Sequence, residues 1–238
     1  MKHMAVDAHC HLCDMKGFDL GKIDLAVNCA YDSGSARRVI AFAVAHPGKT
    51  VPVVGLSPQR CMHAGAEDEI SDIFRMAGES KESILGVGEI GLDYNWADTP
   101  GKRRMQMKCF EMQVRIADEL DLPVVVHSRN AVRDCIGGLS RLGNGVMFHF
   151  FSGSAVEAEE IVDRGWLISI PPLKSGGRLK AIGKVGLECL AAETDAPYVG
   201  RTPLDVVKSI QVIADVKGIG FHDAEEATGK SVKRLFGV

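Results

Sequence analysis

The sequence lacks the features that mark membrane-spanning, exported and disordered chains. No apolar run is long enough to span a bilayer, and the N-terminus has no positively charged segment followed by an apolar one. We therefore expect neither a membrane span nor export by a signal peptide. Aromatic residues make up only 6% of the chain, and no low-complexity tract occurs. Because 46% of the residues are hydrophobic and 25% are charged, the composition is that of an ordinary folded globular protein.

A strong net charge and a disulfide framework are also missing. The formal net charge of −3 predicts no polyanion partner from the whole-protein field, so any contact with nucleic acid would depend on local basic residues. The seven cysteines are odd in number and irregularly spaced, so we expect free thiols in a reducing cytoplasm. Cys10 and Cys13 form a single CxxC pair, which we interpret as chance and not as a zinc ribbon.

The sequence does contain an alternation of short β-rich runs with longer amphipathic segments along its whole length, which is typical of parallel strands joined by helical crossovers. Strands are predicted at residues 5–9, 25–29, 51–55, 84–89, 124–127, 146–150, 166–170 and 190–193. Helices are predicted at residues 33–45, 67–80, 102–120, 130–141, 155–164, 178–185, 204–217 and 224–236. The last helix is expected to begin at Asp223 as its N-cap, with Glu226 at the capping-box spacing.

These eight βα units predict an α/β fold, a (β/α)8 TIM barrel. No linker, repeat or composition break divides the chain, so we expect a single domain over residues 1–238. In such a barrel the chemistry lies at the carboxyl ends of the strands. Residues that can bind metal or substrate should therefore follow several of the predicted strands.

Histidines and carboxylates do follow five of the predicted strands. His9 and His11 lie two residues apart, so a strand points them to the same face. The full set of candidate metal ligands is His9, His11, Glu89, His127, His149 and Asp195. Imidazole and carboxylate groups suit divalent ions such as Mg²⁺, Mn²⁺ or Zn²⁺. Six ligands shared between two ions leave positions open for water and substrate, as a catalytic site requires, and Glu89 is the natural bridging ligand.

Other polar residues near the predicted strand ends are candidates for binding substrate. Arg129 directly follows the strand-five ligand and could hold a phosphate through its planar guanidinium. The candidate substrate-binding residues are Arg129, Ser152, Lys174 and Arg201. Asp93 either touches substrate or holds the loop after strand four. Trp96 in that loop either stacks on an unpaired base or packs as a hydrophobic lid.

The chain also carries five motifs in order: DAHCHL, GEIGLDY, PVVVHSR, HFFSG and ETDAPY. Together they resemble the TatD-type metal-dependent deoxyribonucleases, a branch of the amidohydrolase-like TIM barrels. The resemblance implies that His9, His11 and Asp195 bind one metal ion and that Glu89 bridges to a second. It also implies that His127 and His149 bind this second ion, and that Asp195 accepts a proton from the attacking water.

Two positions depart from that family pattern. Ser57 stands before Pro58 where the family usually has a histidine, so a substrate contact or an extra metal contact is missing there. Asn130 replaces the aspartate of the family's HSRDA motif, which removes a negative charge beside the second metal. These departures predict a substrate preference different from that of better-known members.

The resulting hypothesis is a two-metal hydrolase that cleaves phosphodiester bonds of DNA, with 3'-5' exonuclease-like action on single strands. We infer no protein partner. A second hypothesis keeps the metals but replaces the substrate by an ester, amide or lactone, including D-aminoacyl-tRNA. A third is a non-catalytic scaffold, against which the retention of all six ligands argues.

Overall fold

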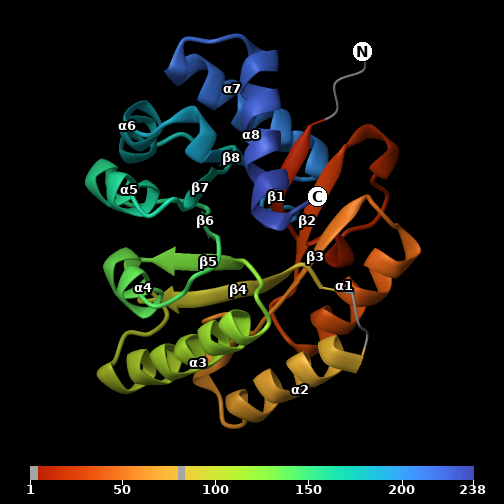
Figure 1. The fold of residues 1–238 in the computed structure, drawn as a ribbon, viewed down its shortest axis with the longest axis vertical. Coiled ribbons are helices and arrows are strands. Elements are labelled where there is room, and N and C mark those ends of the chain that lie inside the picture. Colours follow the sequence, from red (N-terminus) through yellow and green to blue (C-terminus); the bar gives the residue numbers. More distant parts are fainter. Residues whose placement is uncertain (1–4, 80–83) are drawn as a thin grey trace.

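The structure is a computed structural model that describes residues 5–79 and 84–238 (Figure 1). Eight parallel strands pair in chain order to form one continuous sheet. The strands are β1 (Val6–Cys10), β2 (Leu25–Cys29), β3 (Thr50–Val54), β4 (Gly86–Asp93), β5 (Val124–Arg129), β6 (Val146–His149), β7 (Leu167–Ile170) and β8 (Leu190–Ala192). Parallel strands require crossover connections, and α-helices supply most of them.

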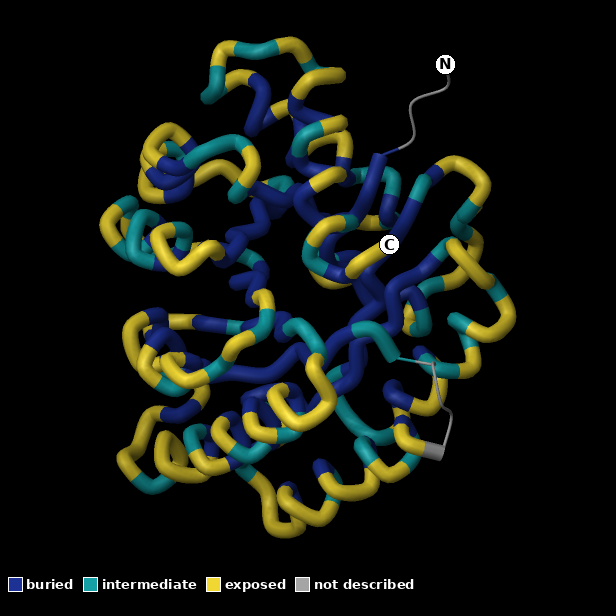
Figure 2. The backbone as a smooth tube through the Cα atoms, in the orientation of Figure 1, coloured by how far each residue is buried: buried dark blue, intermediate teal, exposed yellow. Residues whose placement is uncertain are grey.

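The helices lie around the outside of the sheet, as the ring of coiled ribbons in Figure 1 shows. The α-helices are α1 (Ser33–Ala45), α2 (Ala66–Glu79), α3 (Pro100–Glu119), α4 (Val132–Gly138), α5 (Ala155–Val162), α6 (Gly176–Lys184), α7 (Val206–Lys217) and α8 (Phe221–Phe236). Short 3-10 helices lie in the loops: η1 (Leu12–Asp14), η2 (Leu20–Lys22), η3 (Arg60–Met62), η4 (Leu187–Cys189) and η5 (Pro203–Asp205). Figure 2 shows the strands buried and the outer helix faces exposed.

The first and last strands meet and nearly close the sheet into a barrel. The Thr194 backbone N–H and hydroxyl donate to the two oxygens of the buried Asp7 carboxylate, at 2.9 and 2.5 Å. Beyond them, the Asp195 N–H donates to the His9 carbonyl at 2.9 Å, and the His11 N–H donates to the Ala196 carbonyl at 2.7 Å. The (β/α)8 TIM-barrel prediction is confirmed, and the closure brings the ends of β1 and β8 together.

Alternation along the strands separates two apolar clusters. Val124, Val126 and Phe148 belong to the cluster that includes side chains of α3 to α7. Val125 and Met147 belong to a second cluster with residues of β1, β2, β3 and α8. Because side chains two residues apart share a face of a strand, this second face continues from Val125 and Met147 to the histidines at the carboxyl ends. The barrel interior is therefore apolar at one end and polar at the other.

Every predicted strand and helix overlaps an observed one, although several boundaries differ. The predicted helix 130–141 is shorter in the structure, where α4 spans Val132–Gly138. The predicted helix 67–80 corresponds to α2, and its residue 80 lies outside the described part of the chain. In residues 5–79 and 84–238, no helix combines the length and apolar character needed to cross a membrane.

The predicted start of the last helix is wrong. Helix α8 begins at Phe221 with Gly220 as its N-cap, and no side chain caps it. Phe221 packs against the hydrophobic core, and this contact adds residues to the helix before the predicted start. Asp223 therefore lies inside the first turn, where a negative charge interacts favourably with the helix dipole.

Candidate active site

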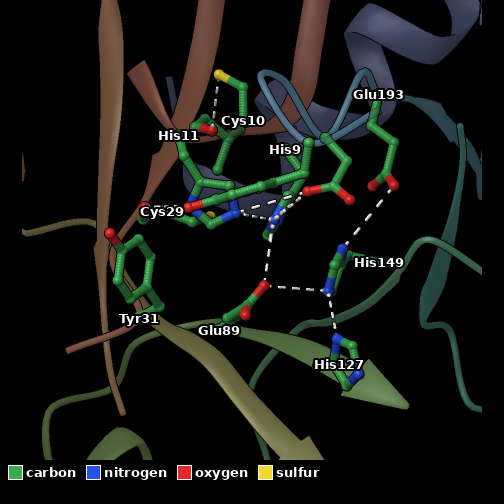
Figure 3. Close-up of polar contacts among 12 residues, drawn as sticks. His9, Cys10, His11, Cys29, Tyr31, Glu89, His127, His149 and Glu193 are labelled. Carbon is green, nitrogen blue, oxygen red and sulfur yellow. Dashed lines mark hydrogen bonds and ion pairs between the residues drawn. The ribbon is translucent and has the colours of Figure 1, made fainter. Parts of the chain in front are cut away.

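Six candidate ligand side chains come together at the carboxyl ends of five strands, as Figure 3 shows for His9, His11, Glu89, His127 and His149. Two groups of side chains have ligand atoms close enough to share a metal ion. The first group is His9, His11 and Asp195, and the second is His9, Glu89 and His149. None of the described residues forms a comparable group elsewhere in the chain.

The first group lies where β1 meets the segment after β8. The Nε2 atoms of His9 and His11 are 3.3 Å apart. Asp195 Oδ1 lies 3.8 Å from His9 Nε2 and 3.6 Å from His11 Nε2. The backbone hydrogen bonds that join Asp195 and Ala196 to His9 and His11 hold this geometry. Both histidines are buried, whereas the Asp195 side chain is 16% exposed and faces the cavity rim.

The second group lies on β1, β4 and β6, with β5 beside it. Glu89 Oε2 is 3.3 Å from His9 Nε2 and 3.2 Å from His149 Nε2. Glu89 therefore lies between the two groups, in the position that a bridging ligand needs. His127 Nδ1 is 3.2 Å from His149 Nε2, which adds a fourth donor to this group.

Hydrogen bonds outside the site decide which nitrogen of two histidines faces inward. The Nδ1 atom of His11 lies 2.9 Å from the Cys29 carbonyl, to which it can only donate. The Nε2 atom of His127 lies 3.1 Å from Asp93 Oδ2. In neutral imidazoles these bonds leave a lone pair on His11 Nε2 and on His127 Nδ1. Both lone pairs lie 3.2 to 3.3 Å from a neighbouring ring nitrogen, so they point into the cluster, where they are available to a shared cation.

The electrostatics of the metal-free side chains agree with a cation site. Burial disfavours charge on His149, but the nearby carboxylates of Glu193 and Glu89 stabilise its charged form, outweigh burial and raise its pKa to about 10. Burial likewise raises the pKa of Glu89, yet the hydrogen bonds with His149 and His9 hold it well below its usual value. The pKa of Asp195 is also lowered, because its hydrogen bond with His11 outweighs its burial. Both carboxylates are therefore ionised and available to bind a cation.

His9 lies fully buried, and the other five candidate ligands line a cavity of about 580 Å³. Its lining residues are His11, Tyr31, Ser57, Gln59, Arg60, Glu89, His127, Ser128, Arg129, His149, Phe150, Ser152, Asp195 and Tyr198. Of the predicted substrate-binding residues, Arg129 and Ser152 therefore lie on the cavity wall. The cavity is within the size range of ligand-binding pockets.

Lys174 and Arg201 do not line this cavity, contrary to the expectation that they face the metal mouth. Lys174 Nζ lies 3.8 Å from Asp215 Oδ2, and the residue lines a separate pocket beside α7. Arg201 is exposed, and its backbone N–H donates to Asp205 Oδ2 at 2.8 Å. Both residues lie several positions beyond their strands, where the loop direction and not the strand decides where a side chain points.

Comparison with known proteins identifies the family of this fold and site. The family model described as TatD related DNase matches residues 6–237. The chain belongs to the TatD-related DNase family. It is similar to the human deoxyribonuclease TATDN3, at 30% identity over 97% of this chain and 94% of the human protein.

Two solved TatD structures superpose closely on this TatD-family chain. The TATD homolog YJJV from Escherichia coli matches with a TM-score of 0.85 and 24% identity, and the match covers both chains completely. A hydrolase of the TatD family from Entamoeba histolytica matches with a TM-score of 0.84 and 17% identity over 98% of each chain. At these identities the two structures support the fold alone.

The two departures from the TatD pattern have different positions. Ser57 is buried on the cavity wall, so the smaller side chain changes the cavity itself. Asn130 has a positive φ of 56°, which asparagine tolerates well. It lines a neighbouring pocket with Arg133 and Ser152 and not the main cavity.

Two acidic side chains of the TatD site were not among the predicted ligands. Glu193 is fully buried, accepts a hydrogen bond from the Ser169 hydroxyl, and places Oε1 3.8 Å from His149 Nδ1. Asp7 ties β1 to the segment after β8 through Thr194. The available signal was spacing: Glu193 precedes Asp195 by two residues, and Asp7 precedes His9 by two, which on a strand places each pair on one face.

Proposed function

We propose that this TatD-family protein is a two-metal hydrolase that cleaves phosphodiester bonds of DNA, beginning at the ends of single strands. The observation that carries the proposal is the convergence of six candidate ligand side chains, five of which line one cavity whose wall also holds Arg129. In this assignment His9, His11 and Asp195 hold one divalent ion. His127 and His149 hold the second, and Glu89 binds both.

Divalent cations, once bound by these residues, would supply the Lewis acidity that lowers the pKa of water and polarises a phosphoryl oxygen. The protein residues supply orientation and a proton acceptor. Asp195 is suited to accept the proton of the attacking water, because its carboxylate is ionised and partly open to the cavity. Asp93 and Glu193 act indirectly, by orienting His127 and His149.

The cavity also supports a phosphate-containing substrate. Arg129 is exposed on the wall two residues beyond His127, so its guanidinium can bind phosphate oxygens in pairs. The Ser152 hydroxyl lies on the same wall and can donate a hydrogen bond to phosphate. A cavity of about 580 Å³ suits the end of a chain better than a duplex. The related human protein is named a deoxyribonuclease, which is consistent with DNA as the substrate.

The test uses purified protein supplied with Mg²⁺ or Mn²⁺ and single-stranded DNA labelled at either end. We expect stepwise release of nucleotides from the 3' end and loss of release in E89Q. A panel of simple esters, amides and lactones, together with D-aminoacyl-tRNA, is tested in parallel. Faster hydrolysis of any of these, with intact DNA, would replace the proposed substrate while keeping the metal site. No hydrolysis of any substrate by metal-loaded protein would favour a non-catalytic scaffold.

A further inference from the structure

Two tyrosines stand beside the first metal-binding group and have no role in the proposed hydrolysis. Tyr31 lies in the loop after β2 and Tyr198 lies in the loop after β8. Both line the cavity. Their rings meet His11 edge-on, with centroid distances of 5.6 Å for Tyr31 and 5.1 Å for Tyr198. Figure 3 shows Tyr31 beside His11. The tyrosines thus form an aromatic wall next to the ligands His9, His11 and Asp195.

Hydrogen bonds fix part of this wall from outside the cavity. The Tyr198 hydroxyl donates to Asp14 Oδ2 at 3.0 Å, and Arg38 Nη2 donates to the other oxygen of Asp14 at 2.9 Å. A phenol is neutral at about pH 7, so neither ring carries a negative charge that would repel phosphate. The wall is therefore uncharged and is anchored before any ligand arrives.

A purely structural role does not account for the exposure of this wall. Tyr198 is 61% exposed although its ring is held between His11 and Asp14. A large ring that serves only packing is normally covered, whereas a fixed and open ring on a cavity wall is a binding surface. By comparison, Trp96 is 57% exposed but does not line the cavity.

We propose that Tyr31 and Tyr198 form the base-binding surface of this site, on which the base of the terminal nucleotide stacks. The inference rests on the proposed function and adds a specificity element to it. Arg129 lies beside His127 in the other ligand group, so it can hold a phosphate while the base occupies the wall at His11. Stacking on an aromatic face accepts every base, so this surface selects for the presence of a base and not for its identity.

The experiment compares two single-stranded oligonucleotides that differ only at the end that is cleaved. One ends in an ordinary nucleotide, and the other ends in an abasic nucleotide with the same sugar and phosphate. For the wild type, we expect kcat/KM to be higher for the base-containing end by roughly 5- to 150-fold, the value of one stacked base. The ratio of the two kcat/KM values should fall toward one in Y31A and Y198A. It should persist in Y198F, which keeps the ring.

The ratio of the two rates separates stacking from structural damage. If the tyrosines only support His11, then Y198A will slow both substrates equally and leave the preference unchanged. Y198L keeps apolar bulk, so it serves as a second test if Y198A does not fold. It should also lose the preference for the base-containing end. W96A should retain it, and loss of the preference in W96A alone would overturn the assignment.

Failure of this inference is distinguishable from failure of the proposed function. A wild-type enzyme that hydrolyses both oligonucleotides equally well would remain a deoxyribonuclease without a base-binding wall. A wild-type enzyme that hydrolyses neither would remove the proposed function and this inference together. Binding of the base-containing and abasic oligonucleotides, measured with Ca²⁺ in place of Mg²⁺, supplies a readout besides activity. We expect tighter binding of the base-containing strand, and equal affinities would overturn the inference.

Discussion

Asp195 adopts a left-handed backbone conformation, with φ of 49°, at the edge of the cavity. Aspartate tolerates this conformation better than most residues, and such conformations concentrate at functional sites. The conformation is held by the hydrogen bond from the Asp195 N–H to the His9 carbonyl. The carboxylate is thus fixed beside the imidazoles of His9 and His11 while part of it remains open to the cavity.

Replacement of this carboxylate tests its role as proton acceptor. D195N preserves size and tolerance of a positive φ, so we expect the variant to fold. Loss of the proton acceptor should lower kcat by about 10²- to 10⁴-fold. Steady-state kinetics with metal content measured in the same sample checks this, and a kcat within threefold of the wild type at full metal occupancy would exclude the role.

Glu193 is a second carboxylate with an indirect role, because it faces His149 and does not line the cavity. E193Q removes the charge that faces His149 Nδ1, and we expect divalent-metal affinity to fall by roughly 10- to 100-fold. Titration calorimetry of metal-free protein measures the affinity. E160Q on the exposed part of α5 is the matched control and should leave the affinity unchanged.

At the level of elements, helix α3 holds two strand ends in place through buried glutamines. Gln106 Oε1 accepts from the Asp93 N–H at 2.9 Å, while its Nε2 donates to the Pro58 carbonyl at 3.0 Å. Gln113 makes a similar pair of bonds with the backbone of Leu56. Helix α3 thereby links the end of β4 to the loop after β3, which carries cavity residues.

Removal of one glutamine should therefore cost stability. Q106A leaves a buried N–H and a buried carbonyl without partners, at about 1–3 kcal/mol for each group. Chemical denaturation should show a lower midpoint without a change in slope. E111A on the exposed face of the same helix should change the free energy of unfolding by less than about 0.5 kcal/mol. A Q106A midpoint equal to that of E111A would contradict this account of α3.

Close contact between β4 and β5 also depends on a glycine. A Cβ atom at Gly91 would lie 2.1 Å from the His127 carbonyl oxygen, and its φ is 137°. G91A should therefore destabilise the fold by more than about 3 kcal/mol and displace His127. G137A in α4 meets no atom within 4 Å and should stabilise by about 0.5–1 kcal/mol. Thermal and chemical unfolding of both variants, with opposite signs expected, checks the contrast.

The sequence predicted the elements well because each strand is a short apolar run between amphipathic helices. It also predicted that the six candidate ligands lie together, because each closely follows such a run, where the strand still fixes the side-chain direction; their binding of metal stays a prediction. Lys174 and Arg201 show the limit, since a few loop residues are enough to turn a side chain elsewhere. Tyr31 and Tyr198 had no ligand-type chemistry to mark them, and only closure of the barrel places them side by side around His11.

At the scale of the whole molecule, the site exists only when the barrel is nearly closed. Its candidate ligands come from β1, β4, β5, β6 and the segment after β8, so they are spread over residues 9 to 195 of the chain. Unfolding therefore disperses the ligands, and ions that bind only the folded state stabilise it by mass action. The seven cysteines are all free thiols in the structure, while the cytoplasmic location inferred from them stays a prediction.

Metal removal should consequently lower the melting temperature. At a free ion concentration about 100 times the dissociation constant, bound metal adds roughly 2.7 kcal/mol for a single site. Differential scanning calorimetry with and without a chelator measures the shift. The double variant H127A/E89Q should show a much smaller shift in melting temperature on metal removal. An undiminished shift would place the stabilising ions elsewhere.

The central claim is that six side chains from five strand ends bind two divalent cations. The most direct measurement is a crystal structure of the metal-loaded protein with anomalous scattering recorded at the absorption edge of manganese or zinc. The account predicts two anomalous peaks per chain, one among His9, His11 and Asp195 and the other among His127 and His149, with Glu89 contacting both. Peaks at other residues, or no peak among these six in fully loaded protein, would contradict it.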